Sequence, residues 1–245
     1  MRLNLEVWRQ AGPDAEGGFE HHTLDGLEPQ LSLLEMLDAL NERLIDEGAE
    51  PVAFESDCRE GICGACGVTV DGRAHGPDPN LPSCYQRLSG YEDGSTVRIE
   101  PLRSAAFPVL RDLVVDRDAL DDVICAGGHV GVDAGTAPDA DAIPIPKDEA
   151  ELALDFAACI GCGACVAACP NGSAHLFAGA KLAHLALLPI PSLERGRRAH
   201  DLVEEMEAQF GPCSLYGECV QVCPAGIPLE AIAAVQRERI RRSAN

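Results

Sequence analysis

The sequence predicts an α+β protein in which a strand-rich first part precedes a mostly helical second part. Apolar and polar residues alternate over 2–8, as in a half-buried strand, and short strands are expected at 67–70 and 96–100. After residue 148 four helical segments are expected, near 149–158, 172–188, 192–209 and 229–243. A chain of 245 residues has room for one large domain or two modest ones.

One helix is expected in the first hundred residues, after a Gly-rich acidic turn at 11–18 and a polar stretch that reaches Pro29. Ser32 and Glu35 have the spacing of a capping box, and Gly48 supplies the stop. The apolar face of this helix consists of Leu33, Leu37, Leu40 and Leu44. Strands around one helix predict a small α+β domain. Phe107 to Leu110 should lead into an acidic helical segment, followed by an irregular connection at 126–148.

The net charge of −21 excludes one class of partner. The chain has 40 acidic residues and 19 basic ones, and an acidic surface repels phosphate, so no nucleic-acid partner is expected. The charge is also uneven, because residues 1–150 hold 30 acidic and 11 basic residues whereas residues 151–245 hold 10 and 8. We therefore expect two bodies of different character.

Twelve cysteines in a reducing compartment point to metal binding. The alternation at the N-terminus is that of a strand and not of a signal peptide, and the longest apolar stretch, around 182–190, is too short to span a membrane. A cytosolic location is therefore the default expectation, and there cysteines seldom form disulfides.

The first cysteine group has the spacing C-x4-C-x2-C-x17-C. It comprises Cys58, Cys63, Cys66 and Cys84. The x4-x2 spacing is that of plant-type 2Fe-2S ferredoxins. Such a loop must turn backbone N–H groups toward the sulfurs, and Gly61, Gly64 and Gly67 are expected to allow positive φ angles. Structural zinc is the alternative, although zinc sites usually pair two separate knuckles.

The second group is a bacterial-type ferredoxin run, C-x2-C-x2-C-x3-C-P, over 159–170. In such runs the fourth cysteine serves the other cluster, which requires a second copy of the run. That copy spans 213–224, with Tyr216 at its second position. Crossing over predicts a 4Fe-4S cluster held by Cys159, Cys162, Cys165 and Cys223.

The remaining cysteines of the two runs give only three thiolates, from Cys169, Cys213 and Cys219. Because Tyr216 replaces the fourth cysteine, we predict a 3Fe-4S cluster at this site. The alternative is a 4Fe-4S cluster with water or another group on the fourth iron. Cys125 lies outside all three sets, and its simplest interpretation is a small buried apolar residue.

Other cofactor chemistry finds no support in the sequence. The chain has no Gly-rich phosphate-binding fingerprint, no histidine pair with ligand spacing and no nucleophile with a matching base. Three clusters in succession along the sequence indicate electron transfer, with no substrate-converting site of the chain's own.

These motifs resemble those of the iron-sulfur subunit of succinate dehydrogenase and fumarate reductase. The resemblance lies in the run CREGICGACG from Cys58, the run FPVLRDLVVDR from Phe107, and the two Cys-Pro runs with a non-cysteine position in the second. It implies a β-grasp 2Fe-2S ferredoxin domain over 1–105 and a mainly helical, bacterial-ferredoxin-like domain over 106–245.

The resemblance also implies partners and an electron path. Electrons would pass from the FAD of a flavoprotein subunit through 2Fe-2S, 4Fe-4S and 3Fe-4S clusters to quinone. The quinone would be held by a membrane anchor subunit, which in some members carries haem b. The chain would then lie peripherally on the cytoplasmic face of the cell membrane.

The sequence departs from the family after its first Cys-Pro. Many members have aromatic residues there, whereas this chain has Asn171 to His175, and Ser214 stands where a histidine is common. We therefore assign no quinone-contacting residue. The alternative function is an iron-sulfur carrier of another flavoenzyme, such as a thiol:fumarate or heterodisulfide-type reductase. Relatives of that kind usually continue into further cysteine-rich modules, whereas this sequence ends at Asn245.

Overall fold

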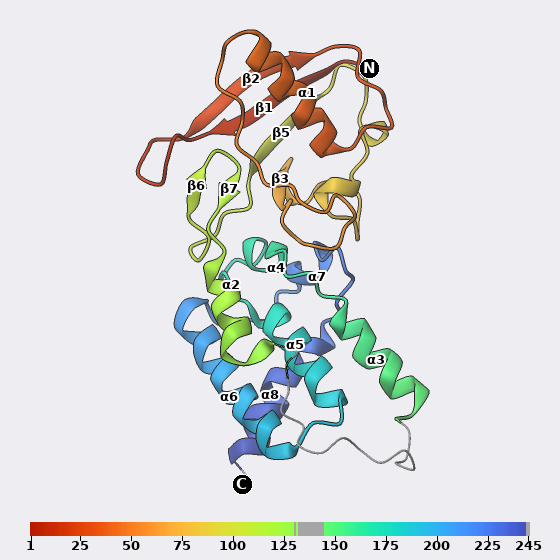
Figure 1. Cartoon of the computed structure of the whole chain (residues 1–245), viewed down its shortest axis with the longest axis vertical. Coiled ribbons are helices and arrows are strands. Elements are labelled where there is room, and N and C mark those ends of the chain that lie inside the picture. Colours follow the sequence, from red (N-terminus) through yellow and green to blue (C-terminus); the bar gives the residue numbers. More distant parts are fainter. Residues whose placement is uncertain (130, 132–144, 244–245) are drawn as a thin grey trace.

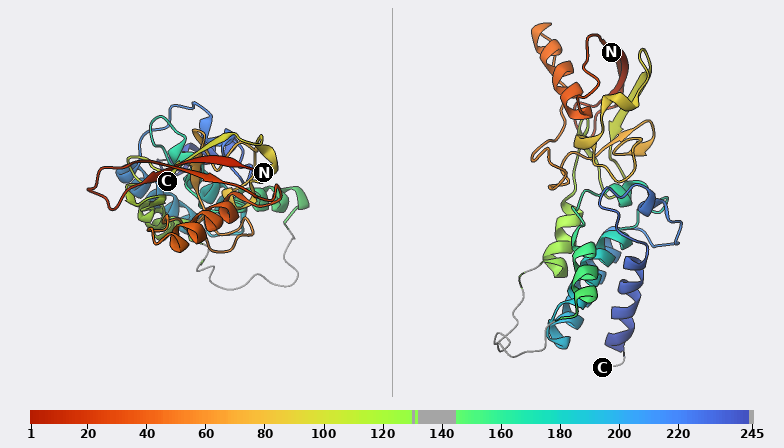
Figure 2. Two further views of the ribbon diagram at one scale, coloured as in Figure 1. Left: turned by 90° about the horizontal axis from the view of Figure 1, so that it is seen from above. Right: turned by 90° about the vertical axis from the view of Figure 1, so that its right-hand side faces the viewer.

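The computed structural model describes residues 1–129, 131 and 145–243, and shows a strand-rich body stacked on a helical one (Figure 1). The right-hand view of Figure 2, turned by 90° about the vertical axis, shows the same succession of the two bodies along the long axis. The strands are β1 (Leu3–Arg9), β2 (Gly18–Leu24), β3 (Val68–Val70), β4 (Arg73–Ala74), β5 (Thr96–Pro101), β6 (Val109–Arg111) and β7 (Val114–Val115). The α-helices are α1 (Leu33–Asp46), α2 (Asp118–Val123), α3 (Lys147–Ala157), α4 (Ala164–Ala167), α5 (His175–Leu187), α6 (Ser192–Gln209), α7 (Glu218–Gln221) and α8 (Glu230–Ser243). The predicted α+β class is confirmed.

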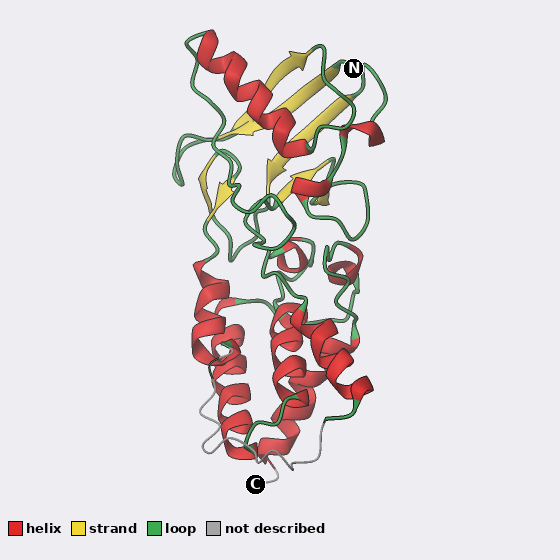
Figure 3. Ribbon diagram, turned by 45° about the vertical axis from the view of Figure 1, so that its right-hand side comes forward, coloured by secondary structure: helices red, strands yellow, loops and turns green. Residues whose placement is uncertain are grey.

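The strand-rich body is a five-stranded mixed sheet that clasps α1. Its strand order is β2-β1-β5-β3-β4, in which β1 and β5 run parallel and the other neighbours are antiparallel. Figure 3 shows the sheet with α1 across one face. The alternation predicted for the first strand is observed, because Leu3, Leu5 and Val7 are buried against the leucine face of α1. This is the β-grasp arrangement.

The boundaries of α1 follow the local signals in the sequence. The hydroxyl of Ser32 accepts the Glu35 N–H at 3.2 Å, and the Glu35 carboxylate accepts the Ser32 N–H at 2.6 Å, which completes the capping box. The helix ends at Asp46, and Gly48 follows with φ of 73°. The predicted helix is confirmed at both ends.

Strand β2 corrects the sequence-based expectation, which placed only a turn and a polar stretch there. Of its seven residues only Leu24 is buried, so no apolar alternation marks it. It is an edge strand that pairs with β1, with Phe19 opposite Trp8 and the two rings in edge-to-face contact at 5.3 Å. Cross-strand pairing rather than burial therefore supports this strand.

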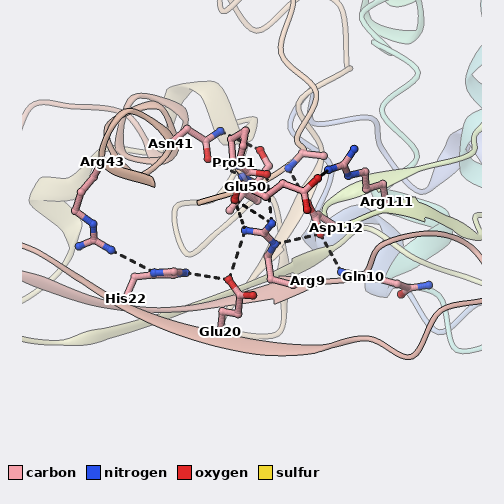
Figure 4. Close-up of polar contacts among 12 residues, drawn as sticks. Arg9, Gln10, Glu20, His22, Asn41, Arg43, Glu50, Pro51, Arg111 and Asp112 are labelled. Atoms are coloured by element: carbon pink, nitrogen blue, oxygen red, sulfur yellow. Dashed lines mark hydrogen bonds and ion pairs between the residues drawn. The ribbon is translucent and has the colours of Figure 1, made fainter. Parts of the chain in front are cut away.

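A β-hairpin precedes the acidic helix α2, where the sequence predicted only a lead-in to that helix. Its turn places Asp112, with φ of 46°, deep against the strand-rich body. The carboxylate of Asp112 accepts hydrogen bonds from Arg9 Nε at 3.2 Å and from the backbone N–H groups of Gln10 at 2.9 Å and Ala53 at 2.8 Å (Figure 4). These three bonds fix the hairpin to the end of β1 and to the loop that follows α1.

The same hairpin belongs to both hydrophobic cores. Leu113 packs in the core of the strand-rich body, whereas Val109 and Val115 pack in the core of the helical body. The sequence-based division into domains 1–105 and 106–245 stays a prediction.

The helical body is built on α5, which packs against α3, α6 and α8. A methyl group on Gly179 of α5 would lie 2.3 Å from the Ala231 carbonyl oxygen of α8, so these helices meet closely. All four predicted helical segments are present, and α6 spans 192–209 as predicted. The helices α4 and α7 have four residues each, which is too short for a periodic pattern. None of the described helices is long and apolar enough to cross a membrane.

Two expectations concern the segment after α2. A turn of π-helix spans Ile124–Gly128, and most of the irregular connection expected at 126–148 lies outside the described residues. Cys125, expected to be buried, is exposed. It lies in this π-helical turn, whose buried residues are Gly127 and Gly128.

Candidate iron-sulfur cluster sites

The first cysteine group lies on the loop between α1 and β3, together with the short 3₁₀ helix that holds Cys84. The four predicted ligands come together there. The thiol of Cys58 interacts with that of Cys63, and the thiol of Cys66 interacts with those of Cys84 and Cys63. Cys66 and Cys84 are buried, whereas Cys63 is exposed.

Backbone N–H groups of this loop turn toward the sulfurs, as the glycine pattern predicted. The Sγ of Cys58 accepts the N–H groups of Glu60, Ile62 and Cys63 at 3.3, 3.4 and 3.3 Å. These bonds stabilise the thiolate and lower the pKa of Cys58 to about 7. The Ala65 N–H points in the same way to the Sγ of Cys63 at 3.4 Å. A negatively charged cluster would be solvated by such donors.

The glycines of the loop have two different uses. Gly61 and Gly64 have φ of 72° and 73°, as expected. Gly67, expected to do the same, is not among the residues with positive φ. Instead a methyl group there would lie 2.9 Å from Leu102 Cδ2, so the buried Leu102 side chain would have to shift to accommodate it. The expectation for Gly67 was wrong because spacing cannot distinguish a turn from a close approach.

The four cysteines that the crossover assigns to the 4Fe-4S cluster line a hollow of about 20 Å³ in the helical body. Its lining cysteines are Cys159, Cys162, Cys165 and Cys223. The structure thus brings Cys223 of the second run, and not Cys169, to the first three cysteines of the first run. Apolar residues such as Leu176 and Phe177 close the hollow, and burial raises the pKa of Cys162 to about 12. Thiols this deeply buried hold no charge alone, but binding iron would displace their protons.

The remaining three cysteines of the two runs line a separate hollow of about 10 Å³. Its lining cysteines are Cys169, Cys213 and Cys219, as the crossover predicted. Tyr216 lines the same hollow on the loop before α7, and its side chain is 61% exposed. Buried His175 also lines it, and its Nδ1 lies 2.9 Å from the Ser173 hydroxyl.

The donor sets consist of cysteine thiols, which are the usual ligands of iron-sulfur clusters. Among the described residues, no three or more His, Cys, Asp or Glu side chains converge closely enough to hold one metal ion. A zinc ion would require its thiolates about 2.3 Å from one centre. The second and third groups instead surround hollows, which suits clusters held by peripheral thiolates.

The three sites follow one another in space. The first lies at the junction of the two bodies, where α4 and α7 cap the helical body (Figure 1). A methyl group on Gly64 would lie 2.4 Å from the Ile160 carbonyl oxygen, so the first and second ligand loops are in contact. Cys165 of the second site interacts electrostatically with Cys219 of the third. The thiol groups therefore form a continuous series.

Two residues at the junction were not singled out from the sequence. Arg117 donates its Nη1 to the carbonyl oxygens of Gly64 at 2.7 Å and Cys162 at 3.4 Å. His75 is buried beside the first site, with its Nδ1 3.1 Å from the Ser83 hydroxyl. Arg117 ends the FPVLRDLVVDR run, which was a signal for its importance. His75 has no such signal.

Comparison with known proteins agrees with this geometry. Residues 4–122 match the 2Fe-2S iron-sulfur cluster binding domain, and residues 158–227 match the 4Fe-4S dicluster domain. The chain is 29% identical to the succinate dehydrogenase iron-sulfur subunit of Bacillus subtilis, over 86% of this chain and 82% of the relative. It is 31% identical to the fumarate reductase iron-sulfur subunit of Escherichia coli, over 85% of this chain and 81% of the relative.

This chain belongs to the family of succinate dehydrogenase and fumarate reductase iron-sulfur subunits. The resemblance stated from the motifs is thereby confirmed. A chain of the Mycobacterium smegmatis Sdh1 complex in the apo form shares the fold, with a TM-score of 0.67 at 21% identity. That alignment covers 99% of this chain and 96% of the other, so the shared fold includes both bodies.

Proposed function

We propose that this chain is the electron-transfer subunit of a membrane-bound succinate:quinone oxidoreductase. When bound, the clusters supply one-electron chemistry that carries electrons from the FAD of a flavoprotein subunit, through 2Fe-2S, 4Fe-4S and 3Fe-4S clusters, to quinone at a membrane anchor. The observation that carries the proposal is the continuous series of three thiol groups in a chain of this family.

The cysteines divide among the clusters as the crossover predicts. The 2Fe-2S ligands are Cys58, Cys63, Cys66 and Cys84. The 4Fe-4S ligands are Cys159, Cys162, Cys165 and Cys223. The grouping of the thiols around the first loop and around the larger hollow supports both sets.

The third cluster is of the 3Fe-4S type, held by Cys169, Cys213 and Cys219. The support is that these three are the cysteines among the residues lining the third hollow, where Tyr216 occupies the fourth position of the run. A tyrosine with most of its side chain in solvent leaves one corner of a cubane without a thiolate.

The chain converts no substrate itself and works only with its partners. A flavoprotein subunit would supply electrons to the first site, and an anchor subunit with quinone, and in some members haem b, would receive them from the third. We place the chain peripherally on the cytoplasmic face of the cell membrane, held by that anchor.

Low-temperature EPR spectroscopy of the detergent-extracted complex tests this function. An oxidised 3Fe-4S cluster is paramagnetic, whereas oxidised 2Fe-2S and ordinary 4Fe-4S clusters are silent. We expect a signal in the complex as isolated, and succinate should diminish it. If only a strong chemical reductant removes the signal, the three-cluster series stands but the chain serves another flavoenzyme, such as a thiol:fumarate or heterodisulfide-type reductase. Absence of the signal from an undamaged sample contradicts the third site.

A further inference from the structure

Arg117 lies where the first and second ligand loops meet. It directly precedes α2, and its side chain is only 21% exposed. Its Nη1 donates to the Gly64 carbonyl oxygen at 2.7 Å and to the Cys162 carbonyl oxygen at 3.4 Å. Its Nη2 pairs with the Glu55 carboxylate at 3.1 Å, which fixes the plane of the guanidinium group.

The bond to Gly64 acts on the first site through one peptide group. The Gly64 carbonyl and the Ala65 N–H belong to the same planar trans peptide, so they point in opposite directions. Arg117 holds the oxygen, and the N–H points to the Sγ of Cys63 at 3.4 Å. A cation bound to the carbonyl oxygen polarises this peptide and strengthens the N–H as a donor to sulfur.

The same guanidinium acts on the second site. It binds the carbonyl oxygen of Cys162, one of the proposed 4Fe-4S ligands. One partly buried cation thus faces both ligand loops.

The geometry points to Arg117 as a positioning residue that joins the first two clusters and raises their reduction potentials. It does so by fixing the two loops against each other, by directing the Ala65 N–H onto Cys63, and by placing a positive charge beside groups that become more negative on reduction. This inference rests on the proposed function, since it concerns two of the clusters assigned there.

Arg73 provides a matched control across the same contact between the two bodies. From β4 its Nη2 donates to the Gln221 carbonyl oxygen, at the end of α7, at 2.7 Å. Arg73→Gln therefore removes the same charge and a similar bond between the bodies. It leaves the Gly64–Ala65 peptide and the Cys162 carbonyl untouched.

The test is a redox titration of the purified complex with dithionite and mediators, followed by the EPR signal of the reduced 2Fe-2S cluster. Arg117→Gln should shift the one-electron reduction equilibrium of this cluster about tenfold toward the oxidised form, which is about 59 mV. Arg73→Gln should leave it unchanged. An unchanged potential in Arg117→Gln, or equal shifts in the two variants, would overturn the inference.

A second variant covers failure of Arg117→Gln to assemble. Arg117→Lys keeps the positive charge but loses the planar guanidinium group that donates to Gly64, Cys162 and Glu55 together. The reduction equilibrium of the 2Fe-2S cluster should therefore shift in the same direction but by less, about threefold. No shift in the lysine variant would then overturn the inference. The titration does not depend on succinate. If wild-type clusters respond to dithionite but not to succinate, the proposed function fails while the effect of Arg117 is still decided.

Discussion

Gly64 and Ile160 meet so closely that no side chain fits between their loops. A Cβ atom on Gly64 would lie 2.4 Å from the carbonyl oxygen of Ile160 and 3.0 Å from the backbone nitrogen of Cys162. Both obstacles are backbone atoms, which cannot move aside as a flexible side chain can. This contact sets the approach of the first ligand loop to the second, and it depends on the absence of one methyl group.

Gly64→Ala should therefore weaken the junction of the two bodies. The variant incurs the left-handed backbone penalty at φ of 73° together with an overpacking cost of about 1–3 kcal/mol. Gly72→Ala is the control, because Gly72 has φ of 79° but a methyl group there would meet no other residue within 4 Å. Thermal unfolding of the purified complex, followed by cluster absorbance, should show Gly64→Ala melting about 5 °C below Gly72→Ala. Equal melting temperatures would mean that the two ligand loops can move apart to accommodate the methyl group without loss of stability.

His75 should make the protein less stable in mild acid. Its Nδ1 accepts the Ser83 N–H at 3.3 Å, and burial, assisted by the charge of Arg117, lowers the His75 pKa to about 4. Because the unfolded histidine titrates near 6.5, the unfolded state binds more protons between these values. The resulting stabilisation is present above about pH 6.5 and falls by about 3 kcal/mol as the pH drops to 4.

The measurement is the melting temperature of the complex between pH 4 and 7. His75→Gln keeps a hydrogen-bond acceptor but cannot titrate, so its melting temperature should fall less steeply than that of the wild type. His21→Gln is the control, because the His21 side chain is 73% exposed and its contact with Glu6 is loose, with 3.8 Å between His21 Nδ1 and the Glu6 carboxylate oxygen. Parallel curves for the wild type and His75→Gln would show that His75 does not titrate in this range.

The sequence predicted those features whose signals are local. The capping box of Ser32 and Glu35 and the leucine face of α1 require no knowledge of the rest of the fold. Cysteine spacing is equally local, because a short loop decides which sulfurs can reach one cluster. Even the pairing of Cys223 with the first run followed from the repeat, since the two runs have equal spacing.

Features that depend on packing between distant segments were missed. Strand β2 is marked by its pairing with β1 and by the contact of Phe19 with Trp8, not by buried alternation. The bonds of Arg117 to Gly64 and Cys162 join residues 53 and 45 positions apart. The local sequence around Arg117 does not predict where its side chain points. Its contacts with the two ligand loops could therefore be found only from the structure.

A pair of cysteine variants should separate the second and third sites. Cys223→Ser should damage the proposed 4Fe-4S site, because Cys223 lines the larger hollow and its Sγ accepts the Ile227 N–H at 3.4 Å. Cys219→Ser should damage the proposed 3Fe-4S site, since Cys219 lines the other hollow. Both variants should keep the 2Fe-2S signal, because neither changes a ligand proposed for that site. EPR spectra of the oxidised and dithionite-reduced complexes give the readout. Loss of the 3Fe-4S signal alone in Cys223→Ser would contradict the crossover.

Tyr216→Cys should convert the third cluster. The tyrosine stands at the second position of its run and lines the hollow with Cys169, Cys213 and Cys219, so a thiol there completes a set of four. We expect a fourth iron to bind, the paramagnetic signal of the isolated complex to disappear, the cluster potential to fall and quinone reduction to slow.

Leu215→Cys is the matched control, because Leu215 lines the same hollow on the same loop and is 65% exposed. It introduces a thiol one residue out of register, so its signal should persist. If both variants keep the signal, the register of the second run is wrong, whereas loss in both would show that any added thiol on this loop reaches the cluster.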